Sequence, residues 1–158
     1  MFSFFKKIKA LFQPRNCIKY QCIENGAPPV RGYPESAGID LPVHKVSCLG
    51  NDVYQLHTNI ILEIPPDHFG LLLFRSGAWS EIMRSEQIVF AQPSVIDSDY
   101  RGEVLYRVKV LGGGLSVNEI FNKNPLQLII IPYRRLTLKR ERNLTKTRRG
   151  EKGFGSSN

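Results

Sequence analysis

The stretch "SVIDSDYRGEVLYRVKVLGGG", residues 94–114, does most to decide the fold class of this chain. Its middle part, "VLYRVKVL", alternates apolar and polar residues, which predicts a strand with one buried face. Three glycines follow and predict a turn. The part before the strand carries two Asp, a Tyr, an Arg and a Glu in a strand–turn setting. Short strands separated by polar turns are typical of all-β proteins.

Other segments extend this interpretation over most of the chain. Strands are predicted at "CIKYQCI" (17–23), "VYQLHTNIILEI" (53–64), "HFGLLLF" (68–74) and "LQLIIIPY" (126–133). Only "WSEIMRSE" (79–86) predicts a short helix. The pattern therefore predicts an all-β sandwich, barrel or jelly roll. No glycine-rich dinucleotide or P-loop motif is present in the sequence.

Composition and charge limit the classes of function. The chain has 158 residues and 42% apolar residues, which suits one domain with a core. Its net charge of +8 favours anionic partners: nucleotides, nucleic acid or membrane phosphates. Many of the cations lie in residues 134–149, without the aromatic-rich motifs of RNA-binding domains. We therefore interpret this stretch as a basic stem that attracts anions, and we expect no specific nucleic-acid partner.

Three cysteines without metal-ligand or redox spacing predict reduced thiols and an intracellular protein, cytoplasmic or nuclear. The three histidines are scattered, so we expect no metal held directly by a cluster of protein ligands. Residues 1–16 form a separate basic, amphipathic extension that Pro14 ends. We expect it to pack on the body or on a neighbouring subunit; the alternative is contact with a membrane surface or targeting to an organelle.

Five polar stretches carry the candidate chemistry. They are "AGID" (37–40), "FRSGAW" (74–79), "SVIDSDYRGEV" (94–104), "NPLQLI" (124–129) and "RGEKGFGSS" (149–157). An Arg, a Ser and a Gly after an apolar strand can bind phosphate oxygens through the guanidinium and the backbone N–H groups. Each stretch alone is a weak signal, and the information lies in the whole set and its order.

In that order, the five stretches resemble the five motifs of the trimeric dUTPase family. The resemblance implies a jelly-roll-like β-barrel with one short helix and a flexible C-terminal arm. It divides the chain into residues 1–16, a domain at 17–140 and an arm at 141–158 that closes a neighbouring active site. The family hydrolyses dUTP to dUMP and pyrophosphate with Mg²⁺, which lowers dUTP and supplies dUMP for dTTP synthesis.

The resemblance also assigns roles to matching residues. Asp97 is expected to deprotonate the attacking water, Gln127 to orient that water, and Asp40 to support the network of metal, water and phosphate. Mg²⁺ is expected to be held through phosphates and water. The homotrimer shares each site: one chain gives the first, second and fourth motifs, another the third, and a third chain the arm. The implied substrate-binding residues are Arg75, Ser76, Gly77, Ala91, Ser94, Val95, Ile96, Tyr100, Arg149, Phe154, Gly155 and Ser156.

Within that set, Arg75, Ser76 and Gly77 are expected to bind phosphate oxygens, and Arg149 the γ-phosphate. Tyr100 is expected to exclude a 2′-hydroxyl by packing on the sugar. Residues 91–96 are expected to read uracil with their main chain, and Phe154 to stack on it.

The chain departs from the family pattern at two places that bear on these roles. Ser94 stands where the family usually has Gly, and "NKNPL" (122–126) replaces Gly-Asp-Arg-Ile-Ala before Gln127. Two alternatives therefore stay open. One is a dUTPase-derived regulatory or binding protein with weakened catalysis. The other is a dCTP deaminase on the same fold, against which the Phe-Gly-Ser arm counts.

Overall fold

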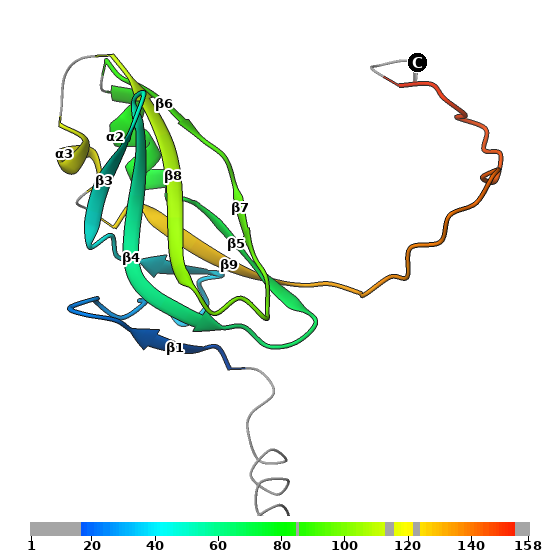
Figure 1. Cartoon of the computed structure of the whole chain (residues 1–158), viewed down its shortest axis with the longest axis horizontal. Coiled ribbons are helices and arrows are strands. Elements are labelled where there is room, and N and C mark those ends of the chain that lie inside the picture. Colours follow the sequence, from blue (N-terminus) through cyan, green and yellow to red (C-terminus); the bar gives the residue numbers. More distant parts are fainter. Residues whose placement is uncertain (1–16, 85, 113–115, 122–123, 154–158) are drawn as a thin grey trace, which may run out of the picture.

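Two antiparallel sheets form the body of the protein. The computed structural model describes residues 17–84, 86–112, 116–121 and 124–153, and Figure 1 shows how they are arranged. The first sheet contains β1 (Lys19–Cys22), β3 (Lys45–Gly50), β4 (Val53–Glu63), β6 (Ile88–Ala91) and β8 (Glu103–Leu111). The second contains β2 (Gly38–Leu41), β5 (His68–Phe74), β7 (Ser94–Ile96) and β9 (Leu126–Pro132).

The strand order confirms the expected all-β, jelly-roll-like fold. The first sheet has the order β1-β4-β8-β6, with β3 also on β4, and the second has the order β2-β9-β5-β7. The predicted closure into a barrel is wrong, because no described strand of one sheet pairs with a strand of the other. The protein is a sandwich of two open sheets, and the segment from β7 to β8 carries the chain from one sheet to the other.

Two helices lie among the described residues, where the sequence predicted one. Helix α2 (Ser76–Arg84) begins earlier than expected, because the chain leaves β5 at Phe74 and the Arg75 carbonyl already accepts the N–H of Trp79 at 2.9 Å. Helix α3 (Val117–Phe121) was not predicted. Its start carries a capping box: Ser116 N–H donates to Glu119 Oε2 at 2.7 Å, and Glu119 N–H donates to Ser116 Oγ at 3.3 Å.

The core lies between the two sheets and under the helices. In β8 the buried residues alternate along the strand, as the sequence pattern predicts. Phe74 sits at the centre of an aromatic cluster, with its ring centroid 5.4 Å from that of Tyr106 and 5.8 Å from that of Phe121. Tyr106 and Phe121 are almost fully buried, so α3 closes the end of the core that β5 reaches.

Strand β4 contains a bend that lets it pair with two strands along one edge. Between the pairs His57–Leu105 and Ile61–Glu103, β4 advances four residues while β8 advances two. Asn59, at the centre of the bend, has a φ of 53° and is 5% exposed. Before the bend β4 pairs with β3, and after it with β1. The bulge therefore holds both neighbouring strands in place.

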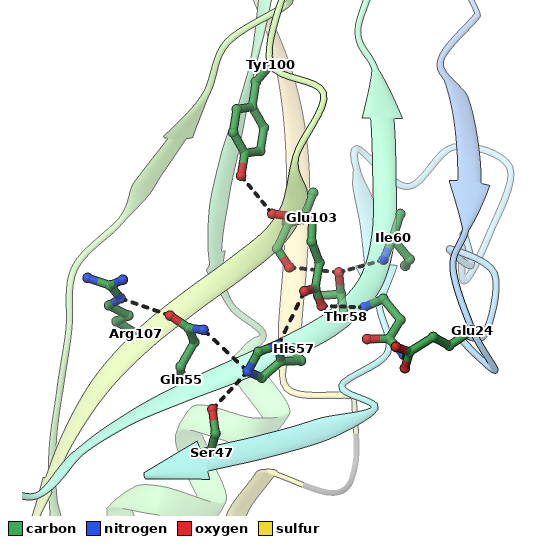
Figure 2. A network of polar contacts seen from close by, with 11 residues as sticks. Glu24, Ser47, Gln55, His57, Thr58, Ile60, Tyr100, Glu103 and Arg107 are labelled. Carbon is green, nitrogen blue, oxygen red and sulfur yellow. Dashed lines mark hydrogen bonds and ion pairs between the residues drawn. The ribbon is translucent and has the colours of Figure 1, made fainter. Parts of the chain in front are cut away.

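The backbone groups at the bend find partners outside the regular ladder. The Thr58 hydroxyl donates to the Val104 carbonyl at 2.8 Å and accepts the Ile60 N–H at 3.2 Å. The Asn59 N–H donates to Glu103 Oε1 at 2.9 Å, and the Asn59 carbonyl accepts the Ile23 N–H at 2.9 Å. Figure 2 shows this network between β4 and β8. Because buried backbone groups are costly to leave unpaired, these side chains stabilise the bend.

The chain leaves the body after β9. Tyr133 N–H donates to the Asp67 carbonyl at 2.8 Å, and from there residues 134–153 form no strand or helix and run away from the sheets (Figure 1). Leu136, Leu138 and Leu144 are 80%, 97% and 84% exposed in this single chain. The boundary between domain and arm at residues 140 and 141 stays a prediction, and residues 1–16 lie outside the described residues.

Cys17, Cys22 and Cys48 are free thiols. Among the helices of the described residues, none combines the length and the apolar character that crossing a membrane requires.

Replacing Thr58 by Val tests the importance of the bend. The substitution keeps the size of the side chain and leaves the Val104 carbonyl and the Ile60 N–H without their hydroxyl partner. We expect the free energy of unfolding to fall by about 1–3 kcal/mol. Urea unfolding at one fixed protein concentration measures it. The matched control is Thr145→Val in the exposed arm, expected to change stability by less than about 0.5 kcal/mol. Equal stability of the two variants would contradict this role of Thr58.

Candidate functional site

Asp40 and Gln127 face each other across two paired strands. The antiparallel register of β2 and β9 places Asp40 opposite Gln127. The Gln127 Nε2 donates to Asp40 Oδ1 at 3.4 Å, and both residues are partly buried. The structure thus brings together the polar residues of the first and fourth motifs, which lie 87 positions apart in the sequence.

Gly38 gives the Gln127 side chain its space. Gly38 lies two residues before Asp40, on the same face of β2. A Cβ added at Gly38 would occupy the position of the Gln127 side-chain carbons and amide nitrogen. The small residue of the first motif is therefore needed so that Gln127 can lie over β2 and reach the carboxylate of Asp40.

Arg75 joins this pair from the end of β5. Its Nη1 lies 3.2 Å from Asp40 Oδ2 and donates to the Asn124 carbonyl at 3.3 Å. The Arg75 backbone N–H donates to the carbonyl of Pro125 at 2.8 Å. Asn124 and Pro125 belong to the segment where the sequence departs from the family pattern. Arg75 is held in place despite this departure, because the Asn124 carbonyl accepts from its guanidinium and the Pro125 carbonyl accepts from its backbone N–H.

The start of α2 places backbone donors beside the same cluster. Ser76 and Gly77 are exposed and form the first turn of the helix. Backbone N–H groups in a first helical turn have no acceptor within the helix, and the positive end of the helix dipole lies there. With the guanidinium of Arg75 next to them, these groups make a site suited to phosphate oxygens.

The residues of the third motif lie at a different place, around a cavity of about 230 Å³. The cavity is lined by Ser94, Val95, Ile96, Asp97, Tyr100, Glu103 and Leu105. The turn at its rim is held by its own residues: Tyr100 N–H donates to the Asp97 carbonyl at 3.1 Å, and Arg101 Nη1 donates to the carbonyls of Ser98 and Tyr100, each at 2.8 Å. Asp97 is exposed at this turn, directly after β7.

In a single chain the two places are too far apart to act on one phosphorus atom. Strand β2, with Asp40, and strand β7, next to Asp97, are the opposite edges of the second sheet. Three strand spacings separate them by roughly 14 Å across the sheet, and the register offsets the two residues by about 13 Å along it. A general base must lie within about 3 Å of the water that it activates. Asp40 and Asp97 of one chain therefore cannot act together on one phosphorus atom.

Two further predicted residues that the structure describes, Ala91 and Arg149, lie outside both places. Ala91 ends β6 and pairs with Val108, and it is not among the residues that line the cavity. Arg149 lies in the arm, where its Nε donates to the Lys152 carbonyl at 2.9 Å next to Gly150, whose φ is 57°. Phe154, Gly155 and Ser156 lie outside the described residues.

No three His, Cys, Asp or Glu side chains converge as metal ligands within the part of the chain that the structure describes. The carboxylate of Asp40 suits Mg²⁺ as an oxygen ligand or as an acceptor for its water molecules, as does that of Asp97.

Sequence reasoning did not single out three features of these places. The role of Gly38 depends on the position of the Gln127 side chain, and the support of Arg75 depends on the Asn124 and Pro125 carbonyls. Glu103 lines the cavity and bonds to the bend of β4, 44 residues earlier. The sequence offers one hint of this role: Glu103 is an acidic residue that directly follows Gly102, at the start of β8, whose buried residues are apolar.

Comparison with known proteins identifies relatives over nearly the whole body. The model of the dUTPase family matches residues 24–158. The deoxyuridine 5′-triphosphate nucleotidohydrolase of Methylocella silvestris is 37% identical over 128 residues, which is 77% of each chain. The Gag-Pro polyprotein of Mouse mammary tumor virus is 31% identical over 129 residues, and this chain, 80% of which is aligned, spans only 14% of that polyprotein.

The fold is also similar to a solved structure. The Staphylococcus bacteriophage 80alpha dUTPase, solved with dUPNHPP, superposes with a TM-score of 0.71 at 21% identity. The superposition covers 90% of this chain and 99% of the phage chain. At this level of identity the likeness supports the fold.

Substitution of Gly38 tests its contact with Gln127. In Gly38→Ala the new methyl group must displace the Gln127 side chain, so we expect the Gln127–Asp40 hydrogen bond to break. Such overpacking costs about 1–3 kcal/mol in the free energy of unfolding. The side-chain amide resonances of Gln127 in an NMR spectrum and a urea unfolding curve measure both effects. Gly32→Ala is the control, because a Cβ there meets no atom within 4 Å. Unmoved Gln127 resonances in Gly38→Ala would refute the role of Gly38.

Proposed function

This chain belongs to the dUTPase family and hydrolyses dUTP as a dUTP diphosphatase, and we propose that each active site is assembled from three copies of the chain. The products are dUMP and pyrophosphate. In the cell this reaction lowers dUTP and supplies dUMP for dTTP synthesis.

The observation that carries the shared site is the separation across the second sheet. Asp40, Arg75 and Gln127 meet at one edge, and the cavity beside Asp97 lies at the other edge. Neither place alone combines phosphate ligands with a base and a nucleoside cavity. A second copy that brings its cavity edge to the Asp40 edge of the first copy would complete the site.

At such a site the two edges have different tasks. Arg75 and the first-turn N–H groups of α2 bind phosphate oxygens, which positions the chain of phosphates and neutralises charge. From the second copy, Asp97 holds a water molecule and takes its proton as the water attacks the α-phosphorus, in line with the departing pyrophosphate. Gln127 donates a hydrogen bond that orients this water or the carboxylate of Asp40. Most of the rate enhancement then comes from positioning and charge neutralisation.

Recognition of the nucleoside belongs to the cavity at the edge of β7. The main chain around Ser94–Ile96 reads the edge of uracil, and a close fit there excludes a 5-methyl group. The Tyr100 ring packs on the sugar and leaves no room for a 2′-hydroxyl. Ser94 replaces the usual Gly of the family, and its backbone pairs with Leu72 in a regular ladder. This pairing supports a hairpin that still presents its main chain to a base.

The carboxylates fit a role for Mg²⁺. The ion, when bound, neutralises the triphosphate and makes pyrophosphate a better leaving group. The carboxylate of Asp40 would hold such an ion, as a direct ligand or through water molecules. Arg75 lies within 3.2 Å of that carboxylate and offsets its charge next to the phosphates.

The arm supplies the third part of the site. It leaves the body at Tyr133 and carries three exposed leucines and the basic residues up to Arg149. Burying these leucines on another copy would stabilise the assembly by removing apolar surface from water. Arg149 then pairs with the γ-phosphate, and Phe154 stacks on uracil.

Asp97→Asn tests the assignment of the base. The amide keeps the size of the side chain but takes up no proton, so we expect affinity for dUTP to stay close to that of the wild type and turnover to fall by roughly 10²-fold or more. Pyrophosphate release with Mg²⁺ measures turnover, and calorimetry with a non-hydrolysable dUTP analogue measures affinity. The control is Asp99→Asn, an exposed carboxylate two residues on. Turnover equal to that of the wild type would remove Asp97 as the base.

The same assay with dUTP, dCTP, dTTP and UTP separates the alternative functions. Release of pyrophosphate from dUTP alone supports the proposal. No release from any of the four supports a regulatory or binding protein, and deamination of dCTP identifies a dCTP deaminase.

Truncation tests the role of the arm. Without residues 149–158 the leucine-bearing part of the arm is still present, so we expect the trimer to form. The γ-phosphate and the base lose Arg149 and Phe154, so turnover of dUTP is expected to fall sharply. Light scattering gives the mass of the assembly, and pyrophosphate release gives the turnover. A truncated protein with full activity would show that the arm does not close the site.

A further inference from the structure

The carboxylate of Glu103 is fully engaged, although no role in the reaction has been assigned to it. Oε1 accepts the N–H of Asn59 at 2.9 Å, and Oε2 lies 3.3 Å from His57 Nδ1. The side chain is 19% exposed, in contact with the bend of β4 (Figure 2). Glu103 thereby fixes the first residue of β8 to the least regular point of the first sheet.

His57 extends this attachment to a third strand. Its Nε2 lies 2.8 Å from Ser47 Oγ on β3 and 3.3 Å from Gln55 Nε2. In the tautomer that carries its proton on Nδ1, His57 donates to Glu103 and accepts from Ser47. The carboxylate is thus held from two sides, which leaves it little freedom to move.

The main chain of the same residue holds Tyr100. The Tyr100 hydroxyl donates to the Glu103 carbonyl at 3.0 Å, so the ring folds back over the turn (Figure 2). Gly102 permits this position, because a Cβ there would collide with the Tyr100 ring and hydroxyl. Any shift of Glu103 relative to β4 therefore moves the acceptor on which the tyrosine depends.

Glu103 and Tyr100 also line the same cavity of about 230 Å³. A pocket that rejects a ligand because of one extra hydroxyl works by steric exclusion. Steric exclusion requires that the residue in contact with the hydroxyl position, here Tyr100, does not move. Tyr100 is 43% exposed in the single chain, so side-chain packing within the chain does not by itself fix the position of its ring. The connection through Glu103 to β4 supplies that rigidity.

We propose that Glu103 is a positioning residue: by attaching the start of β8 to the Asn59 N–H, it fixes Tyr100 and so determines the preference for 2′-deoxyribose over ribose. This inference rests on the proposed function, because it concerns the nucleoside cavity of that site. Glu103 itself touches no reacting atom.

The test is the ratio of kcat/KM for dUTP to kcat/KM for UTP, measured by pyrophosphate release. In Glu103→Ala the attachment to β4 is lost, so Tyr100 can move away from the position of the 2′-hydroxyl and UTP binds more tightly. We expect the ratio to fall about tenfold, mainly through a lower KM for UTP. In Glu103→Gln the amide oxygen still accepts the Asn59 N–H, and His57 can change tautomer to accept from the amide. We therefore expect the Gln variant to keep a ratio within about twofold of the wild type.

The matched control is Glu63→Ala. It also removes a carboxylate of the first sheet, at the last residue of β4, where Glu63 pairs with Lys19 of β1 through an ion pair at 2.7 Å that lies at the surface. Its ratio is expected to equal that of the wild type. If Glu103→Ala does not fold, Glu103→Asp replaces it: the shorter side chain keeps the charge but lies about one methylene short of the Asn59 N–H.

Two results would overturn the inference. One is an unchanged ratio in a folded Glu103→Ala or Glu103→Asp variant. The other is an equal loss of kcat/KM for both nucleotides, since it indicates a general structural role. A wild type that hydrolyses neither nucleotide refutes the proposed function instead. In that case the role of Glu103 is tested by binding. The ratio of the affinity for the α,β-imido analogue of dUTP to that for the UTP analogue is compared between the Glu103 variants and the wild type.

Discussion

The bend of β4 at Thr58 and Asn59 is the constraint on which the rest of the structure depends. A single long strand has to serve β3 at one end and β1 at the other, while β8 follows it along the opposite edge. It does so only because side chains replace the missing ladder bonds, and Thr58 and Glu103 supply the decisive ones. The same two residues place the start of β8, where the chain has just crossed over from the second sheet. The geometry of the cavity beside Asp97 and Tyr100 therefore depends on β4, a strand that does not line it.

The second sheet imposes a different condition. Its order, β2-β9-β5-β7, puts Asp40 and the cavity beside Asp97 at opposite edges. Open edges invite contact with other chains, and the proposed function assigns a different part of the site to each edge. The exposed leucines of the arm add apolar surface that a lone chain cannot cover. Both features agree with the proposed assembly, in which no copy would be complete by itself.

Much of the fold could be predicted from the sequence because it rests on local periodicity. The alternation in 104–111 and the apolar runs at 68–74 and 126–133 correspond to β8, β5 and β9. Helix α3 was missed because its five residues are too few for a period, although its Ser-x-x-Glu cap was legible. The open sandwich, the bend at Asn59 and the tasks of Gly38 and Glu103 could not be predicted. Each depends on a partner strand far along the chain. Gly38 matters because it has no side chain, which leaves space for that of Gln127.

The distance between Asp40 and Asp97 has a genetic consequence under the shared-site proposal. Two damaged forms of the chain, one lacking a working Asp40 and the other a working Asp97, would each be inactive alone. In mixed trimers some sites would combine the intact Asp40 of one chain with the intact Asp97 of another. Two defective alleles would then restore activity together, whereas a chain that lost both residues would impair every trimer that it entered.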